Sequence, residues 1–163
     1  MKLSLGIDPG LRGGIAALGA GGDLIGTWPM PVAGGEVHAT ALADLLRSLR
    51  CADQHQDIGL VCLEKVASMP QQGVASTFTF GTGWGMVRGV CAALSVPVLL
   101  VPATVWKKRV LLGYTHDKTG AVHLCTSRWP TAELVQPGCR KPHDGIADAL
   151  CLAEYGRLRE ARP

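Results

Sequence analysis

Four acidic residues, far apart in the sequence, have the types and spacing of a divalent-metal site. Asp8 and Glu64 each end an apolar, strand-like run. Asp144 and Asp148 are four residues apart in a helix-like run, which puts both carboxylates on one helical face. Like charges on one face repel, so a cation between them is the simpler account. Carboxylate oxygens are the hard ligands that Mg²⁺ prefers.

Two such ions would activate a water molecule and stabilise the leaving oxygen of a phosphodiester. The sequence has no cluster of Cys or His that favours zinc instead. Each acid alone also has an ordinary structural explanation. Asp8 would be a turn residue, Glu64 a surface acid at a strand end, and Asp144 and Asp148 acids at a helix start. The metal prediction therefore depends on all four residues being brought together.

The pattern of apolar residues predicts the elements that would do this. We expect strands over 2–8, 13–18, 23–28, 58–63 and 96–101, helices over 40–49, 74–94, 102–112, 117–129 and 142–158, and loops over 30–38 and 67–73. Three strands followed by alternating strands and helices predict an α/β fold, with a mixed central sheet flanked by helices. The near-continuous apolar run at 58–63 indicates a buried strand parallel to the first. Asp8 and Glu64 would then meet at the carboxyl edge of the sheet, where open α/β sheets bind ligands.

Length and composition set the class of protein. The 163 residues, 47% of them hydrophobic, predict one globular domain over residues 1–163. No apolar stretch reaches ~18 residues, so no membrane association is expected. The chain goes from Met1-Lys2 straight into a strand pattern without a signal-peptide region, which predicts an intracellular protein. We therefore expect a cytoplasmic location.

Charge and cysteine content add two predictions. Residues 1–102 carry six basic and seven acidic residues, whereas residues 103–163 carry ten basic and six acidic residues. A basic C-terminal part suits a polyanion such as nucleic acid, although a solvated basic face is the plain alternative. The six cysteines have no CxxC spacing. We expect buried or half-buried thiols rather than disulfides.

Four short motifs, in order along nearly the whole chain, resemble those of RuvC-type Holliday-junction resolvases, especially the phage-borne versions and the plant organellar resolvase. They are Gly6-Ile7-Asp8-Pro9-Gly10, Leu63-Glu64-Lys65-Val66, Val87-Arg88-Gly89-Val90 and Ala147-Asp148-Ala149-Leu150. The resemblance implies a ribonuclease H-like fold and a homodimer. It also implies paired hydrolysis of four-way DNA junctions that leaves 5′-phosphates, with two Mg²⁺ per active site and Mn²⁺ as a substitute.

The same resemblance implies Asp8, Glu64 and Asp148 as metal ligands. Many members of the family carry Asp or His three residues before the last Asp, where this chain has Gly145. The ligand would then be displaced by one residue to Asp144, or His143 would take a metal or acid–base role. Which of the two completes the site is left open at this point.

The resemblance also implies DNA contacts. Lys107 and Lys118 match basic positions near the scissile phosphate, and Lys118 is a catalytic candidate as well; Lys108 and Arg109 could share this duty. The other DNA-binding candidates are Arg12, Gln71, Gln72, Phe78, Phe80, Arg140 and Lys141. An aromatic residue after Glu64 would stack on an unpaired base, although core or dimer packing explains it equally.

Two further features concern packing. Trp84, Trp106 and Trp129 are predicted to be packing residues. Glycines 81, 85 and 89 share one face of the predicted helix 74–94 and would allow close approach of another helix or of a nucleic-acid backbone.

Other functions fit part of the pattern. A ribonuclease H-like nuclease could act on other branched DNA or on an RNA–DNA hybrid. A junction-binding protein without catalysis is a second alternative, but a pure binder gains nothing from four acids facing phosphate. A sugar-kinase-like nucleotide binder could use the motif at 6–10, but the chain is too short for two such lobes.

Overall fold

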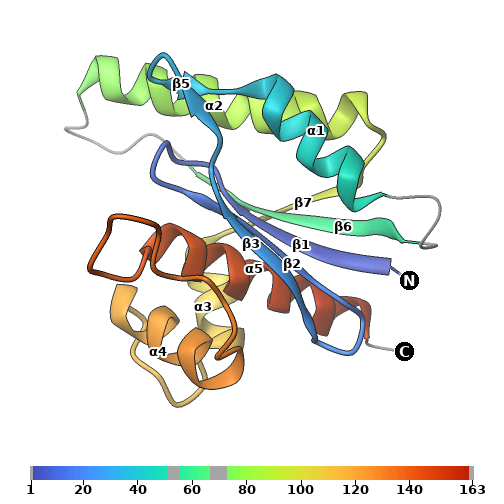
Figure 1. Ribbon diagram of the computed structural model, residues 1–163, viewed down its shortest axis with the longest axis vertical. Helices are drawn as coiled ribbons and strands as arrows, with labels where there is room; N and C mark the ends of the chain where they lie inside the picture. Colours follow the sequence, from blue (N-terminus) through green and yellow to red (C-terminus); the bar gives the residue numbers. More distant parts are fainter. Residues whose placement is uncertain (1, 51–55, 67–72, 162–163) are drawn as a thin grey trace.

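A computed structural model of the chain describes residues 2–50, 56–66 and 73–161. Figure 1 shows a central sheet between two layers of helices. The strands are β1 (Lys2–Asp8), β2 (Gly14–Leu18), β3 (Leu24–Pro29), β4 (Val32–Ala33), β5 (Glu36–Val37), β6 (Asp57–Glu64) and β7 (Val98–Val101). The helices are α1 (Ala39–Leu49), α2 (Val74–Ala93), α3 (Ala103–Val110), α4 (Lys118–Arg128) and α5 (Asp144–Glu160).

The five-stranded sheet has the order β3-β2-β1-β6-β7. The β1–β2 and β2–β3 pairs are antiparallel, and the β1–β6 and β6–β7 pairs are parallel. The predicted mixed sheet is therefore confirmed, as is the parallel pairing of the first strand with the buried strand that ends at Glu64. The register pairs Ile7 with Leu63, so the next residue of each strand, Asp8 and Glu64, lies at the same edge of the sheet.

Each face of the sheet has its own hydrophobic core. Alternate β1 residues Leu3, Leu5 and Ile7 pack with buried residues of α1 and α2. The opposite face packs against α3, α4 and α5. Because successive side chains of a strand point to opposite faces, Asp8 shares the α5 face with Ser4 and Gly6. Cys62 belongs to the core on this face, so Glu64, two residues later, points the same way.

Helix α5 lies unusually close to β1. A Cβ atom on Gly6 would collide with the carbonyl oxygen of Ala149 and lie 2.8 Å from Cβ of Leu152. The hydroxyl of Ser4 donates a hydrogen bond to the carbonyl oxygen of Ala153 at 2.7 Å. Small residues at the contact thus bring the helix against the strand. This approach carries the first turns of α5 to the end of β1, where Asp8 lies.

A buried ion cluster holds α4 to α5. Glu154 is fully buried, and Arg157 donates two hydrogen bonds to its carboxylate, at 2.7 and 2.8 Å. Arg128 at the end of α4 makes an ion pair of 2.7 Å with the same carboxylate. Removing both arginines would leave the buried Glu154 carboxylate without a counter-charge, which is strongly destabilising. The cluster therefore fixes the helix that begins at Lys118.

The structure departs from the predicted elements in the loop over 30–38 and at several element ends. The predicted loop over 30–38 contains the β4–β5 hairpin, whose turn residues Gly34 and Gly35 have φ of +61° and +80°. Such turns accept glycine readily, and two-residue strands are too short to leave a periodic signal. Strand β7 begins at Val98 rather than at 96. Pro97, which precedes it, has no backbone N–H to donate to a sheet.

Most of the predicted loop over 67–73 lies outside the described residues. The prediction for the cysteines is confirmed for Cys62, Cys91, Cys125 and Cys151, which are buried, and wrong for Cys139, which is exposed. Cys139 lies in an irregular segment that no helix or strand covers. Among the helices of the described residues, none is long and apolar enough to cross a membrane.

Candidate active site

The carboxyl edge of the sheet brings Asp8 and Glu64 together. Each is the last residue of its strand, and the strands are parallel neighbours. Neighbouring strands lie about 4.8 Å apart, so the two side chains leave adjacent backbones on the same face. Both residues are half-buried, which allows a ligand to reach them from outside.

Helix α5 supplies the other two carboxylates. Asp144 is its first residue and Asp148 follows one turn later. Gly145 forms a bridge with Gly13 in the turn after β1. A Cβ atom on Gly145 would collide with the carbonyl oxygen of Arg12 and lie 3.0 Å from Oδ2 of Asp8. The start of α5 therefore rests directly against Asp8, and only glycine fits at the contact.

The electrostatics of Asp8 reflect this convergence. Its pKa is raised from 3.8 to about 7, first by burial, then by the charges of Asp148 and Glu64. The Gly10 N–H, which donates to Oδ1 at 3.5 Å, lowers the pKa in part, and Asp144 makes the smallest contribution. Hence Asp148 and Glu64 interact with Asp8 more strongly than Asp144 does.

The donor set suits Mg²⁺. Four carboxylates supply only oxygen, and their mutual repulsion at Asp8 is what a divalent cation would relieve. Among the residues that the structure describes, no group of three or more His, Cys, Asp or Glu side chains is placed so that it could hold a metal ion by itself. Mg²⁺ is compatible with an incomplete set of protein ligands, because it keeps several waters and takes part of its shell from substrate phosphates. The four residues therefore fit the cation as an open site.

His143 lies next to this group as the N-cap of α5. Its Nδ1 accepts a hydrogen bond from the backbone N–H of Ile146 at 3.3 Å. Capping of this kind satisfies an N–H that the helix cannot. The bond engages Nδ1, so Nε2 is the ring nitrogen on which a metal or acid–base role would depend.

The predicted basic residues are distributed around the site. Lys107 is half-buried, with Nζ 5.3 Å from the centre of the Trp106 ring. Lys108, Arg12, Arg140 and Lys141 are exposed. The turn that carries Arg12 touches α5 through its backbone, and residues 140–141 lead into the N-terminus of the same helix.

The structure does not describe the side chains of three other DNA-binding candidates, Lys118, Gln71 and Gln72. Lys118 begins α4 directly after the cap formed by Asp117, which accepts hydrogen bonds from the N–H groups of residues 119 and 120 at 3.0 Å. The side chain of Lys118 lies outside the described part of the structure. Gln71 and Gln72 fall in the segment that is not described.

The two phenylalanines differ. Phe78 has 75% of its side chain exposed, although large apolar residues usually avoid water. Phe80 is half-buried and lines a groove with Leu11, from the turn after Asp8. Phe78 is therefore placed on the surface of α2, and Phe80 beside Leu11 in the turn that follows Asp8.

Two tryptophans have contacts that the sequence did not predict. Trp106 is fully buried, as expected of a packing residue, but its Nε1 donates to Oε2 of Glu64 at 3.2 Å. The Nε1 of Trp84 donates to the carbonyl oxygen of the same residue at 3.1 Å. A buried indole N–H usually finds an acceptor, so the need for a partner was foreseeable, although its identity was not.

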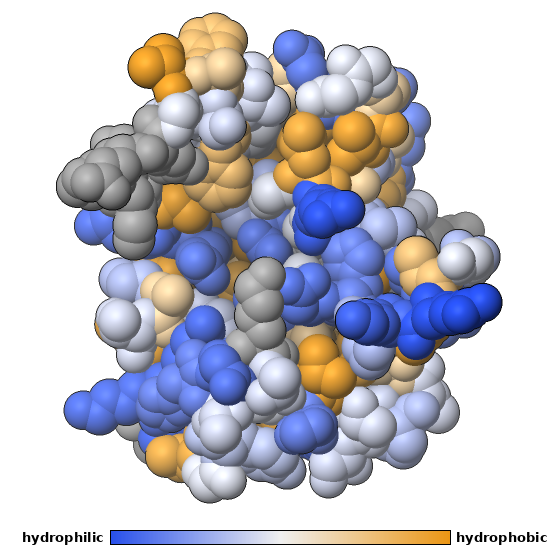
Figure 2. Space-filling view, turned by 90° about the vertical axis from the view of Figure 1, so that its left-hand side faces the viewer, coloured by the Kyte–Doolittle hydropathy of each residue, from blue (hydrophilic) through white to orange (hydrophobic). Residues whose placement is uncertain are grey.

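The molecular face at the carboxyl edge of the sheet, where Asp8 and Glu64 lie, has both polar and apolar regions. Figure 2 shows hydrophilic side chains gathered across its middle, with hydrophobic residues in the part above, over the α2 layer. Val74 and Phe78 are among the exposed apolar residues of α2. The face thus combines polar chemistry with an apolar rim.

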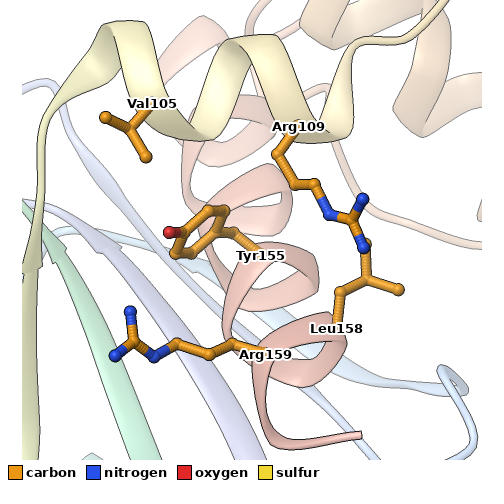
Figure 3. Close-up of a pocket in the computed structure, with 5 residues that line it drawn as sticks. All are labelled: Val105, Arg109, Tyr155, Leu158 and Arg159. Carbon is orange, nitrogen blue, oxygen red and sulfur yellow. The ribbon is translucent and has the colours of Figure 1, made fainter. Parts of the chain in front are cut away.

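A separate groove of about 490 Å³ lies between α3 and the C-terminal half of α5 (Figure 3). Its lining residues are Val105, Arg109, Tyr155, Leu158 and Arg159. The four carboxylates come instead from the strand ends and from the first turns of α5. Because the groove lining has no carboxylate or nucleophile cluster, the four carboxylates are the candidate active site. Arg109 thereby faces a different part of the surface from Glu64.

The fold is ribonuclease H-like, with a mixed five-stranded sheet between helices. Within that class it matches RuvC of Thermus thermophilus, with a TM-score of 0.65 at 19% sequence identity over 97% of this chain and 96% of that one. A second structure, T. thermophilus RuvC in complex with a Holliday-junction substrate, matches with a TM-score of 0.68 at 16% identity over 99% and 97% of the two chains. No protein-family model matches the sequence, and no curated protein matches it significantly. The likeness establishes a RuvC-type fold.

Proposed function

We propose that the protein is a Mg²⁺-dependent, structure-selective DNA endonuclease that resolves four-way junctions by paired phosphodiester hydrolysis, leaving 5′-phosphates. The observation that carries the proposal is that parallel neighbouring strands end at Asp8 and Glu64 and that the start of α5, which carries Asp144 and Asp148, rests against Asp8. The raised pKa of Asp8, about 7, agrees with this arrangement; burial is its largest cause, followed by the charges of Asp148 and Glu64. The RuvC-type fold supports the choice of substrate, because one matched RuvC structure contains a Holliday-junction substrate.

Each element has a role in this proposal. Asp8, Glu64 and Asp148 would hold the cations, and Asp144 would complete the set. When bound, Mg²⁺ supplies the positive charge that favours ionisation of the attacking water and stabilises the leaving oxygen. The half-buried carboxylates leave one side open, so a phosphate oxygen can approach.

Positive side chains would bind the DNA backbone. Lys107 on α3 and Lys118 at the start of α4 are proposed at the scissile phosphate, with Lys108, Arg12, Arg140 and Lys141 along the flanking backbone. Phosphate contacts position the substrate without reading its sequence. Phe78, which is largely exposed, would stack on a base that the junction leaves unpaired. Gln71, Gln72 and Phe80 are further proposed DNA contacts. His143 is the alternative to Asp144 as the residue that completes the metal site.

A homodimer would supply two such sites for paired nicks. Support comes from the exposed face of α2, where a side chain at Gly81, Gly85 or Gly89 would meet nothing within 4 Å. Val74 is 88% exposed on the same helix. A second copy packed along these glycines would bring the two helices close together.

The decisive experiment is cleavage of a labelled mobile four-way junction with and without Mg²⁺, with both nicks mapped. We expect symmetric nicks with 5′-phosphate ends only when metal is present. Linear duplex, flap DNA and an RNA–DNA hybrid of the same sequence are the competing substrates. Preferred cleavage of the hybrid or the flap would overturn the junction assignment and leave a nuclease of another specificity.

Variants separate catalysis from binding. Asp8→Asn, Glu64→Gln and Asp148→Asn should each lower cleavage roughly 1000-fold, since a lost cation contact costs several kcal/mol of transition-state stabilisation. Junction binding in Ca²⁺ or EDTA should be retained. The matched control is Asp44→Asn, which removes an exposed acid paired with Arg47 on α1. Full cleavage by the Asp8 or Glu64 variant would contradict a reaction at these carboxylates, whereas junction binding without any cleavage by the wild type in Mg²⁺ would favour a protein that only binds junctions.

A further inference from the structure

Glu64 is held by indole groups from both sides of the sheet. Trp106 on α3 donates to its carboxylate oxygen Oε2 at 3.2 Å, and Trp84 on α2 donates to its carbonyl oxygen at 3.1 Å. Trp106 belongs to the core that includes α5, whereas Trp84 packs against the core that includes α1. The backbone and the side chain of this one residue are thus fixed by different layers of the molecule.

The bond from Trp106 restricts a flexible side chain. Glutamate has several rotatable bonds, and ordering it on cation binding costs conformational entropy unless it is already ordered. Trp106 has no exposed surface, so its ring cannot move without disturbing the core. The hydrogen bond occupies one lone pair of Oε2, and the remaining lone pairs of the carboxylate can face a cation. Outer hydrogen bonds of this kind orient ligands in metal sites.

Trp106 also touches the predicted phosphate-binding residue. The Nζ atom of Lys107 lies 5.3 Å from the centre of the Trp106 ring, within the range of a cation–π interaction. One buried ring therefore contacts both a proposed cation ligand and a proposed phosphate ligand.

We propose that Trp106 is a positioning residue that presents the Glu64 carboxylate to the divalent cation. The inference depends on the proposed function, because it concerns the metal site of that function. The competing explanation is that Trp106 only fills the core and that its N–H takes the nearest acceptor.

Trp129 provides a matched control in the same molecule. It is 5% exposed, its Nε1 donates to the carbonyl oxygen of Gly22 at 2.9 Å, and Arg128 lies 5.0 Å from its ring centre. Trp129 is therefore buried nearly as completely as Trp106 and has a similar N–H hydrogen bond and a similar cation–π contact. Its partner is a backbone carbonyl in the turn between β2 and β3, not a carboxylate.

The test compares Trp106→Phe with Trp129→Phe, each of which keeps a buried ring and removes one N–H donor. For the first readout, the unfolding midpoint of the DNA-free protein is measured as Mg²⁺ is added. The value compared is the Mg²⁺ concentration at which half of the rise in this midpoint is reached. The second is the Mg²⁺ dependence of junction cleavage. We expect Trp106→Phe to need roughly tenfold more Mg²⁺ in both, with a smaller loss of the rate at saturating Mg²⁺. Trp129→Phe should lose comparable stability and leave both Mg²⁺ midpoints unchanged.

A measurement on the unmutated protein avoids dependence on the folding of a variant. Titration with Mg²⁺ should shift the indole N–H resonance of Trp106 in a nitrogen–proton correlation spectrum and leave that of Trp129 in place. If the Trp106 resonance stays fixed, or if both Phe variants have the Mg²⁺ midpoint of the wild type, the positioning role is wrong while the nuclease proposal stands. If the wild type shows neither Mg²⁺-dependent stabilisation nor cleavage, both proposals fail.

Discussion

Replacing Asp8 by asparagine should stabilise the metal-free protein at alkaline pH even though it removes cleavage. The reason is the raised pKa of Asp8, about 7 against 3.8, caused first by burial and then by Asp148 and Glu64. Above pH 7 the folded protein must hold this carboxylate ionised beside other acids. Asparagine has nearly the same shape and carries no charge.

The sign and size follow from proton linkage. The folded pKa exceeds the unfolded one, so between about pH 4 and pH 7 the unfolded state has released a proton that the folded state retains. Stability from this group is therefore lost as the pH rises through that window, and none is lost below it. A shift of about three units at 1.36 kcal/mol each gives an upper bound of about 4 kcal/mol. The free energy of unfolding of Asp8→Asn, relative to that of the wild type, should therefore be about 2–4 kcal/mol higher at pH 8 than at pH 4.

The assay is urea unfolding of both proteins in EDTA at several pH values between 4 and 8. Asp44→Asn is the control, because that exposed acid pairs with Arg47 and should change stability by less than about 1 kcal/mol at every pH. Added Mg²⁺ should stabilise the wild type above pH 7 and the Asp8 variant much less, since the cation relieves the same repulsion. A difference between wild type and variant that is equal at pH 5 and pH 8 would refute the reasoning about clustered charge.

Four other substitutions test the packing and the site. Gly6→Ala should destabilise the fold by about 3 kcal/mol in urea unfolding, because its Cβ would strike the backbone of α5; an unchanged midpoint would contradict that contact. Gly85→Gln meets open space and raises helix propensity, so it should keep the monomer folded by circular dichroism while light scattering shows loss of the dimer; a persistent dimer would exclude this face. Phe78→Ala should weaken junction binding roughly tenfold in a gel-shift titration and leave duplex binding unchanged, because base stacking contributes ~1–3 kcal/mol; equal losses on both substrates would argue against stacking. The cleavage rate of Asp144→Asn should be at least tenfold higher than that of Asp148→Asn, because Asp144 raises the pKa of Asp8 less than Asp148 does. The reverse order of the two rates would make Asp144 the principal ligand.

The sequence was sufficient for the features that are local. Asp8 and Glu64 close strands because an apolar run ends at each, and the spacing of Asp144 and Asp148 follows from the helical repeat. The parallel pairing of β1 with β6 was predictable because a strand that is apolar throughout needs cover on both faces. These features need no knowledge of distant packing.

Features that depend on packing between distant elements could not be predicted. The bond between Trp106 and Glu64 joins residues 42 positions apart and depends on how α3 rests on the sheet. Gly6 reads as an ordinary strand residue until α5 is placed against it. The β4–β5 hairpin has two-residue strands, whose pattern is too short to distinguish from a loop.

The displaced acid at the start of α5 illustrates how packing limits ligand placement. RuvC-type sequences commonly have Asp or His three residues before the last ligand, a position that is Gly145 in this chain. A side chain there would collide with the carbonyl oxygen of Arg12 and approach Oδ2 of Asp8 to 3.0 Å at its Cβ. The close contact between the β1–β2 turn and α5 therefore excludes a ligand at that position and requires any additional one to come from a neighbouring residue. Asp144 supplies a carboxylate one residue earlier, rotated about 100° around the helix. That rotation is consistent with the small effect of Asp144 on the pKa of Asp8, and it makes Asp148 the stronger ligand candidate on this helix.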